Sequence, residues 1–134
     1  MDQEPSGDAQ IRVVIADDHL LFAEALSTLL DRHERIDVVG AAATGPEAID
    51  QALTLNADVV VMDVGMPGAD GLETTRRLRT IAPRTRVIVL TGLTDSDLQQ
   101  RAADAGASAL LTKGAADREV IDAIISVYDE RMNI

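Results

Sequence analysis

Short apolar runs along this chain alternate with longer stretches in which apolar residues recur every three or four positions. The runs are rich in β-branched residues and typical of buried strands; they lie at residues 11–16, 36–42, 58–62, 86–90 and 108–111. The longer stretches are typical of helices with one apolar face. We expect helices at residues 19–33, 72–80, 95–105 and 117–131, and another that opens at Gly45 and Pro46.

Five predicted strands therefore alternate with five predicted helices. Strands that are apolar almost throughout suit a parallel sheet with helices on both faces, and right-handed crossovers connect such strands. The pattern predicts an α/β fold with a doubly wound, five-stranded parallel sheet. We expect residues 11–134 to form this domain, and the polar residues 1–10 to form a flexible tail.

Polar side chains stand where four of the predicted strands end. Asp17 and Asp18 follow the first apolar run, and Asp63 closes the third. Thr91 follows the fourth run, and Lys113 lies just after the fifth. In a doubly wound sheet the ligand site lies beyond the carboxyl ends of the strands. The fold would therefore gather these five residues at one edge.

Such a set of side chains suits the handling of a phosphoryl group. Asp17 and Asp18 would hold Mg²⁺, which prefers carboxylates, waters and a phosphate oxygen. Asp63 would be both a metal ligand and the nucleophile, because carboxylates form acyl phosphates. Lys113 would pair with the phosphoryl group or with Asp63, and Thr91 would donate a hydrogen bond to a phosphoryl oxygen.

Each of these residues also has a simpler interpretation. Asp18 would start the helix at residue 19 as an N-cap, and Asp63 would be a turn residue before a Gly-Pro loop. Thr91 alone would be an ordinary strand residue, and Lys113 alone a solvated charge. Their occurrence together at one edge of the sheet favours the functional interpretation.

The residue two positions after Asp63 bears on the kind of chemistry. It is Gly65, whose backbone carbonyl would be available to the metal. A hydrolytic aspartate-based phosphatase would want a carboxylate there, so the glycine favours a phosphoryl group that persists. The glycines at 65, 68 and 71 do not match the dinucleotide fingerprint, and no P-loop, GxSxG motif or cysteine nucleophile occurs.

The composition excludes several classes of protein and site. There is no cysteine among the 134 residues, which excludes disulfides and thiolate metal sites. No apolar stretch approaches the roughly 18 residues of a membrane span, and the acidic N-terminus is unlike a signal peptide, so we expect a cytoplasmic protein. A net charge of −11 argues against direct binding of nucleic acid. His19 and His33 are expected on helix surfaces or as capping residues, because neither has a second histidine at metal-ligand spacing.

Four segments carry a resemblance to a known family: VVIADDH at 13–19, VVVMDVGMPGADGLE at 59–73, VIVLTG at 87–92 and AGASALLTK at 105–113. In their order and spacing the chain closely resembles the receiver domain of bacterial two-component response regulators, over residues 11–131. The segment RIDVVGAAATGPEAID at 35–50 resembles the subfamily whose receivers precede a LuxR-type helix-turn-helix domain.

The resemblance implies a flavodoxin-like (βα)5 fold with strand order 2-1-3-4-5. It implies that Asp63 accepts a phosphoryl group from a sensor histidine kinase with Mg²⁺ bound, Asp18 being the direct ligand and Asp17 a water-mediated one. Thr91 and Lys113 match the switch hydroxyl and the lysine of the family. Phosphorylation would remodel the surface of the fourth helix, fifth strand and fifth helix to control an effector and, through it, transcription.

On this basis the chain is expected to be a phosphoacceptor with at most slow self-dephosphorylation, and not an enzyme. Nucleic acid would be bound only by a DNA-binding domain outside this chain, so we expect a piece of a longer regulator rather than a stand-alone receiver. A homodimer through the first, fourth or fifth helix is possible. No membrane partner is expected.

Three departures from the family pattern leave alternatives open. Leu110 stands where an aromatic switch residue is common, Gly114 where proline or aspartate is common, and Gly65 where a larger side chain is common. Leu110 and Gly114 motivate the alternative of a pseudo-receiver, an interaction module that works without phosphorylation. A small phosphatase is the third hypothesis.

Overall fold

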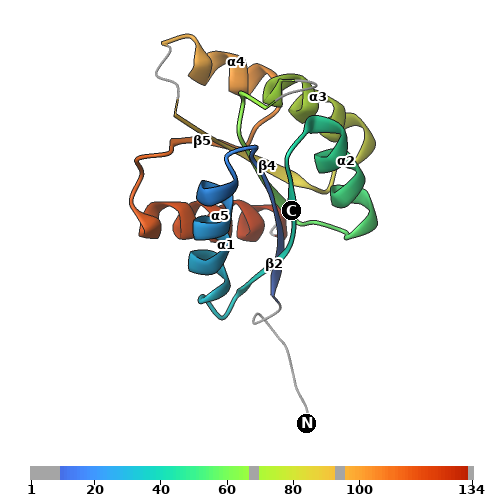
Figure 1. Cartoon of the computed structure of the whole chain (residues 1–134). Coiled ribbons are helices and arrows are strands. Elements are labelled where there is room, and N and C mark those ends of the chain that lie inside the picture. Colours follow the sequence, from blue (N-terminus) through green and yellow to red (C-terminus); the bar gives the residue numbers. More distant parts are fainter. Residues whose placement is uncertain (1–9, 67–69, 93–95, 133–134) are drawn as a thin grey trace.

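A five-stranded parallel sheet, with helices on both faces, forms the molecule (Figure 1). The computed structural model describes residues 10–66, 70–92 and 96–132. The strands are β1 (Ile11–Ala16), β2 (Ile36–Ala42), β3 (Val59–Met62), β4 (Arg86–Thr91) and β5 (Ala109–Thr112). The helices are α1 (Leu20–Asp31), α2 (Gly45–Thr54), α3 (Gly71–Ile81), α4 (Leu98–Asp104) and α5 (Asp117–Met132).

The strand order β2-β1-β3-β4-β5 confirms the predicted doubly wound fold. All predicted strands and helices are present, and their ends differ from the predicted ones by a residue or two. The exception is the fourth helix, predicted from residue 95. Its described part begins at Leu98, and residues 93–95 lie outside the described residues. Of the predicted tail at residues 1–10, only Gln10 is described.

Two separate cores lie on the two faces of the sheet. Successive side chains of a strand point to opposite faces, and in β3 Val60 and Met62 pack on one side while Val59 and Val61 pack on the other. The first core adds apolar residues of α2, α3 and α4, and the second adds those of α1 and α5. The strands are apolar on both faces because both faces are covered.

Local signals in the sequence fix where several helices begin and end. Thr44 caps α2 by accepting a hydrogen bond from the Glu47 N–H at 3.2 Å, with Pro46 in the first turn. Asp70 caps α3 by accepting from the Glu73 N–H at 2.8 Å. Gly106 follows α4 with φ of +97°, a left-handed conformation that favours glycine. No helix among the described residues is long and apolar enough to cross a membrane.

Candidate phosphoacceptor and metal site

The register of the sheet places two carboxylates side by side. Ala16 at the end of β1 pairs with Met62 at the end of β3, so Asp17 and Asp63 follow on neighbouring strands. The Asp63 N–H donates to the Ala16 carbonyl at 2.9 Å, which continues the strand pairing by one residue. Sequence order alone keeps these residues far apart, and parallel pairing brings them together.

The other two expected strand-end residues come from β4 and β5. Thr91 pairs with Thr112, and the Lys113 N–H donates to the Thr91 carbonyl at 2.8 Å. Thr91 is buried, and both Thr91 and Lys113 line a pocket of about 450 Å³ at this edge of the sheet. The pocket is also lined by His19, Phe22, Asp63, Gly65 and Gly92.

Lys113 is the cation of this group. Its Nζ lies 2.7 Å from Oδ2 of Asp17 and 3.7 Å from Oδ1 of Asp63, and its side chain is only 17% exposed. The ammonium also stands 4.7 Å from the centroid of the Phe22 ring, a cation–π distance. The interpretation of Lys113 as a freely solvated charge is therefore wrong, because the fold turns its ammonium onto two buried carboxylates.

Asp63 has the least favourable environment of the carboxylates at this edge of the sheet. The residue is 5% exposed, and its Oδ2 is a buried oxygen with no hydrogen-bond partner among the described residues. Burial raises the pKa of Asp63, and the neighbouring negative charge of Asp17 raises it further. Lys113 acts in the opposite direction and lowers the pKa. A buried oxygen without a partner can accept a bond from an incoming ligand.

The segment after β1 forms a tight turn around Asp17. The backbone N–H and the ring Nδ1 of His19 both lie 2.9 Å from Oδ1 of Asp17. His19, and not Asp18, occupies the N-cap position of α1, so the simpler interpretation of Asp18 as the N-cap is wrong. The Asp18 carboxylate does not cap the helix, and its Oδ1 lies 3.7 Å from Nδ1 of His19.

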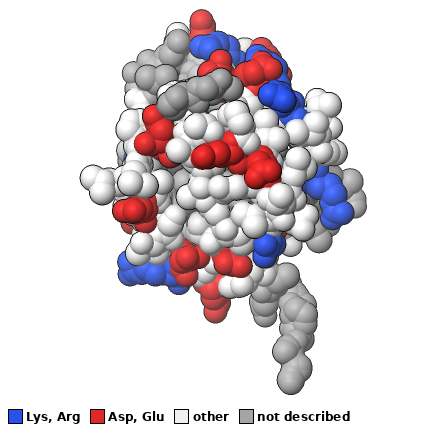
Figure 2. All heavy atoms as spheres, turned by 45° about the vertical axis from the view of Figure 1, so that its right-hand side comes forward, with Lys and Arg blue, Asp and Glu red and all other residues white. Residues whose placement is uncertain are grey.

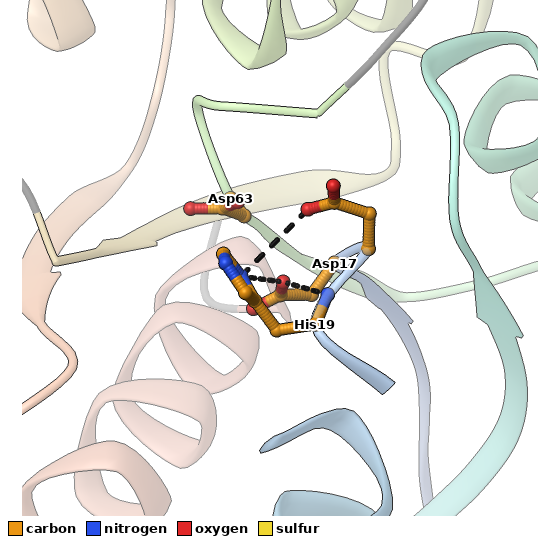
Figure 3. A group of neighbouring side chains, drawn as sticks. Asp17, His19 and Asp63 are labelled. Carbon is orange, nitrogen blue, oxygen red and sulfur yellow. Dashed lines mark hydrogen bonds and ion pairs between the residues drawn. The ribbon is translucent and has the colours of Figure 1, made fainter. Parts of the chain in front are cut away.

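Four residues at this edge could hold a metal ion. One ligand atom each from Asp17, Asp18, His19 and Asp63 lies within 4.8 Å of the others. Figure 3 shows Asp17, His19 and Asp63 facing one another from the segments after β1 and β3. Three carboxylates, one with an unpartnered buried oxygen, fit a hard divalent cation such as Mg²⁺. The role predicted for the Gly65 carbonyl stays a prediction; Gly65 lines the same pocket.

A glycine holds the loop after β3 against Asp63. The Gly71 N–H donates to the Val64 carbonyl at 3.1 Å, which brings the start of α3 back over the end of β3. A Cβ on Gly71 would collide with the backbone carbonyl of Asp63 and stand 2.8 Å from Cα of Val64. The close approach therefore requires glycine, and it fixes the backbone from which the Asp63 side chain projects.

Sequence reasoning missed two residues of this site. His19 was expected on a helix surface or as a capping residue, yet its ring lies on Asp17, and it makes no side-chain capping bond within the described residues. Phe22 lies within the helix predicted at residues 19–33, and no role at the site was predicted for it. Their positions, two and five residues after Asp17, were the available signal. By contrast, His33 lies in the turn between α1 and β2, where its Nδ1 accepts a hydrogen bond from the Arg35 N–H at 3.1 Å, so it is a turn residue and not a helix cap.

The charge of the surface is mainly acidic. Figure 2 shows Asp and Glu side chains across the middle of the face that comes forward there, with Lys and Arg nearer its margins. This distribution agrees with the net charge of −11 and offers no broad basic surface on that face for nucleic acid.

Comparisons with known proteins identify relatives of this chain. Residues 13–125 match the response regulator receiver domain family. The chain is 41% identical over 118 residues to the response regulator UvrY of Escherichia coli (strain K12), covering 88% of this chain and 54% of UvrY. The chain therefore spans about half the length of the curated relatives it matches.

Solved structures give the same result for the fold. The signal receiver domain of the putative response regulator NarL from Mycobacterium tuberculosis superposes with a TM-score of 0.86 at 29% identity, over 90% of this chain and 98% of that one. A LuxR-family two-component response regulator from Aurantimonas sp. SI85-9A1 also gives 0.86, at 32% identity, over 92% of this chain and 88% of that one.

Proposed function

Because this chain belongs to the response regulator receiver family, we propose that it is a phosphorylation switch with Asp63 as the phosphoacceptor. The observation that carries the proposal is the buried Oδ2 of Asp63, which has no partner among the described residues. Asp63 lines a pocket that also contains Lys113 and Thr91. An oxygen kept unpaired beside a lysine and opposite two further carboxylates suits a nucleophile better than a structural group.

The proposed reaction is a transfer from a phosphohistidine of a sensor kinase. A carboxylate oxygen of Asp63 attacks phosphorus, so that an O–P bond forms while the P–N bond breaks. The electron pair leaves with the imidazole nitrogen, which takes up a proton, and Asp63 becomes an acyl phosphate. A divalent cation held by Asp17, Asp18 and Asp63 would neutralise charge on the phosphoryl oxygens. Lys113 and Thr91 would hold the product by donating hydrogen bonds.

The phosphoryl group is proposed to persist, so the chain would act as a switch and not as a phosphatase. A Cβ at residue 65 would stand 3.8 Å from Oδ2 of Asp63, within reach of an attacking water. The residue there is Gly65, which has no side chain to act as acid or base. The site would therefore hydrolyse its own acyl phosphate only slowly.

An apolar surface beside the pocket supports docking of a kinase. Leu20 and Leu21, at the start of α1, are 68% and 81% exposed. They adjoin Phe22, which lines the same pocket as Asp63. Large apolar side chains left this exposed are typical of interaction sites. We therefore propose that the kinase docks at this end of α1. The transfer would take place in the cytoplasm.

The output of the switch is proposed to pass through α4, β5 and α5. Thr91 and Lys113 lie at the ends of β4 and β5, so contacts with a phosphoryl group would pull on both strands. Leu110 of β5 is half-buried against the core shared with α4, which gives movement of β5 a route to that helix. In the full-length protein, a DNA-binding domain outside this chain would turn this change into control of transcription, with a homodimer as the active form.

Labelling with a small phosphodonor tests the proposal. Acetyl phosphate and Mg²⁺ should add the mass of one phosphoryl group to the chain, measured by intact-protein mass spectrometry. Asp63→Asn should abolish the adduct. Asp58→Asn is the matched control, because Asp58 precedes β3 as Asp63 follows it, and it should label normally.

Three outcomes would contradict the proposal in different ways. An unlabelled wild-type chain, under conditions where a control receiver reacts, would reject the phosphoacceptor role. Partner binding that is unchanged in Asp63→Asn and in the presence or absence of phosphodonor would favour the pseudo-receiver, which Leu110 and Gly114 motivate. Steady release of phosphate over many turnovers would favour the small phosphatase.

A further inference from the structure

His19 is placed at the metal site by the local backbone. It occupies the N-cap position of α1 with an extended conformation, φ −83° and ψ 91°, and its side chain makes no capping bond within the described residues. The backbone N–H instead donates to Oδ1 of Asp17, which turns the ring back over the end of β1. The side chain is 67% exposed, yet its Nδ1 faces inward, 2.9 Å from that same oxygen (Figure 3).

Nδ1 of His19 and the carboxylates of Asp17 and Asp63 lie around one positive charge, the ammonium of Lys113. The ammonium of Lys113 lies 3.0 Å from Nδ1 of His19, 2.7 Å from Asp17 and 3.7 Å from Asp63. Three of the four candidate ligand residues thus surround one cationic group. In the tautomer that carries its proton on Nε2, the lone pair of Nδ1 that accepts from the ammonium is the one that a metal ion would use.

The spacing of the donors suits one ion, and the unpartnered oxygen points to a missing ligand. Opposite ligands of an octahedral cation stand about 4.2 Å apart, twice a bond length of about 2.1 Å. The four candidate ligand atoms lie within 4.8 Å of one another, so a small contraction would suffice. The buried Oδ2 of Asp63 is the independent sign of a ligand, because it lacks any partner among the described residues.

We propose that His19 is a nitrogen ligand of the divalent cation at this site, which therefore takes a first-row transition ion such as Ni²⁺, Co²⁺ or Zn²⁺ more tightly than Mg²⁺. Imidazole favours these borderline ions, whereas Mg²⁺ prefers carboxylates and water. The proposal rests on the cation site of the proposed function and adds His19 and the resulting choice of metal.

Paired titrations of Ni²⁺ and Mg²⁺ into the wild-type chain and into His19→Ala test the proposal. Loss of the imidazole should weaken Ni²⁺ binding by at least the roughly 10–100-fold that loss of a partner behind a metal ligand costs, and should leave Mg²⁺ binding within about twofold, as followed by calorimetry. His33→Ala, which removes the other histidine of the chain, is the matched control and should change neither affinity. His19→Asn, with an oxygen in place of nitrogen, should keep Mg²⁺ binding and not restore Ni²⁺ binding.

A spectroscopic measurement locates the nitrogen directly. Pulsed electron paramagnetic resonance on the Mn²⁺-loaded chain should show coupling to an imidazole ¹⁴N that disappears in His19→Ala and survives in His33→Ala. Mg²⁺ should displace Ni²⁺ competitively, and Asp63→Asn should weaken both ions, since all would share one site.

Several results would overturn the assignment of His19. Equal weakening of Ni²⁺ and Mg²⁺ in His19→Ala would show that His19 acts only by positioning Asp17. Ni²⁺ binding that Mg²⁺ does not displace would be adventitious binding to a surface histidine. Normal Mg²⁺-dependent labelling of Asp63 in either case would leave the proposed function intact, whereas a wild-type chain that binds Mg²⁺ but is not labelled would count against that function alone.

Discussion

The two aspartates that flank β3 have opposite environments. Asp58, before the strand, accepts a hydrogen bond from the Arg12 N–H on Oδ2 at 2.9 Å, and its carbonyl accepts from the Arg86 N–H at 2.9 Å. Asp63, after the strand, has a buried oxygen with no partner among the described residues and a pKa raised by burial. One strand of four residues separates an aspartate whose carboxylate and backbone link β3 to β1 and β4 from an aspartate whose carboxylate stays available.

The comparison extends to the two ends of the sheet. The end near Asp58 also has a pocket, of about 480 Å³ against about 450 Å³ at the other end. At that end the buried Thr85 hydroxyl donates to the Ala57 carbonyl at 2.8 Å, and Nε of Arg12 donates to the Leu55 carbonyl at 2.9 Å. Pocket size therefore does not distinguish the two ends. The two ends differ in that charged side chains crowd around Asp63 and leave one of its oxygens unsatisfied among the described residues. Selection for stability alone would remove such an arrangement.

The largest expected effect tests how the functional end is held. Gly71→Ala should lower the free energy of unfolding by about 3 kcal/mol, because the new Cβ collides with the Asp63 carbonyl and overpacking against backbone is poorly relieved. This loss outweighs the roughly 1 kcal/mol that alanine offers over glycine in a helix. Urea unfolding measures the change. Gly65→Ala is the control, since its Cβ has only an ordinary contact, and it should stay within about 0.5 kcal/mol. Equal stabilities of the two variants would refute the close-approach argument.

The next effect tests the structural end. Asp58→Ala should lower the free energy of unfolding by about 2 kcal/mol, because the Arg12 N–H loses its acceptor. Phosphoryl labelling of the folded protein should be unchanged, because no contact of the Asp63 pocket is removed. Urea unfolding and mass spectrometry on the same sample check both parts. A stable variant that fails to label would reverse the division of roles between the two ends.

Binding of Mg²⁺ should also distinguish the two ends of β3. At a free concentration ten times the dissociation constant, Mg²⁺ should stabilise the wild-type chain by about 1.4 kcal/mol. The same gain is expected for Asp58→Ala, and a much smaller one for Asp63→Asn. Thermal melts with Mg²⁺, with Ca²⁺ as a size control, measure the shifts. An identical shift in all three proteins would place the cation elsewhere.

The smallest effect has the opposite sign to the Asp58 substitution. Asp63→Asn should raise the free energy of unfolding by about 1 kcal/mol near neutral pH, because it removes a buried charge that lacks a full set of partners. The pKa of Asp63 is raised in the folded state, so the wild-type deficit is present at a pH above that raised pKa. As the pH falls through the raised pKa toward 3.8, the folded wild type takes up its proton and the difference disappears.

Urea titrations of the wild-type chain and Asp63→Asn across acid and neutral pH, without divalent cations, measure this difference. A gain that grows on acidification would mean that the charged carboxylate stabilises the fold.

Most of the fold could be predicted because its signals are local. The alternation of apolar runs with helical stripes gave all five strands and all five helices, and Thr44, Pro46 and Gly106 act at helix ends as their chemistry suggests. The fourth helix differs most from its predicted range, since it was predicted at residues 95–105 and its described part is Leu98–Asp104. The ends of a helix depend on a few capping contacts of single residues. They are therefore harder to predict than the helix itself, which a repeating pattern indicates.

The sequence predicted that several polar residues lie together at one edge of the sheet, but it did not predict their contacts. The sequence predicted the common location of Asp17, Asp63, Thr91 and Lys113, because each stands at or just after the end of an apolar run and parallel strands end at a common edge. His19 was not expected there, since its ring orientation depends on a turn around Asp17 that no periodicity encodes. The need for glycine at residue 71 likewise follows from a contact with the carbonyl of Asp63 that only the folded loop reveals.

The sequence by itself determined which elements form, which edge of the sheet carries polar groups, and that a carboxylate stands at the end of β3. The tertiary structure alone decided that Asp63 is buried with an oxygen that has no partner in the described part of the chain, while Asp58, before the same strand, is satisfied. The physical reason is that apolar period and turn chemistry are properties of neighbouring residues. Burial, pKa and hydrogen-bond satisfaction depend on what packing brings near from other strands.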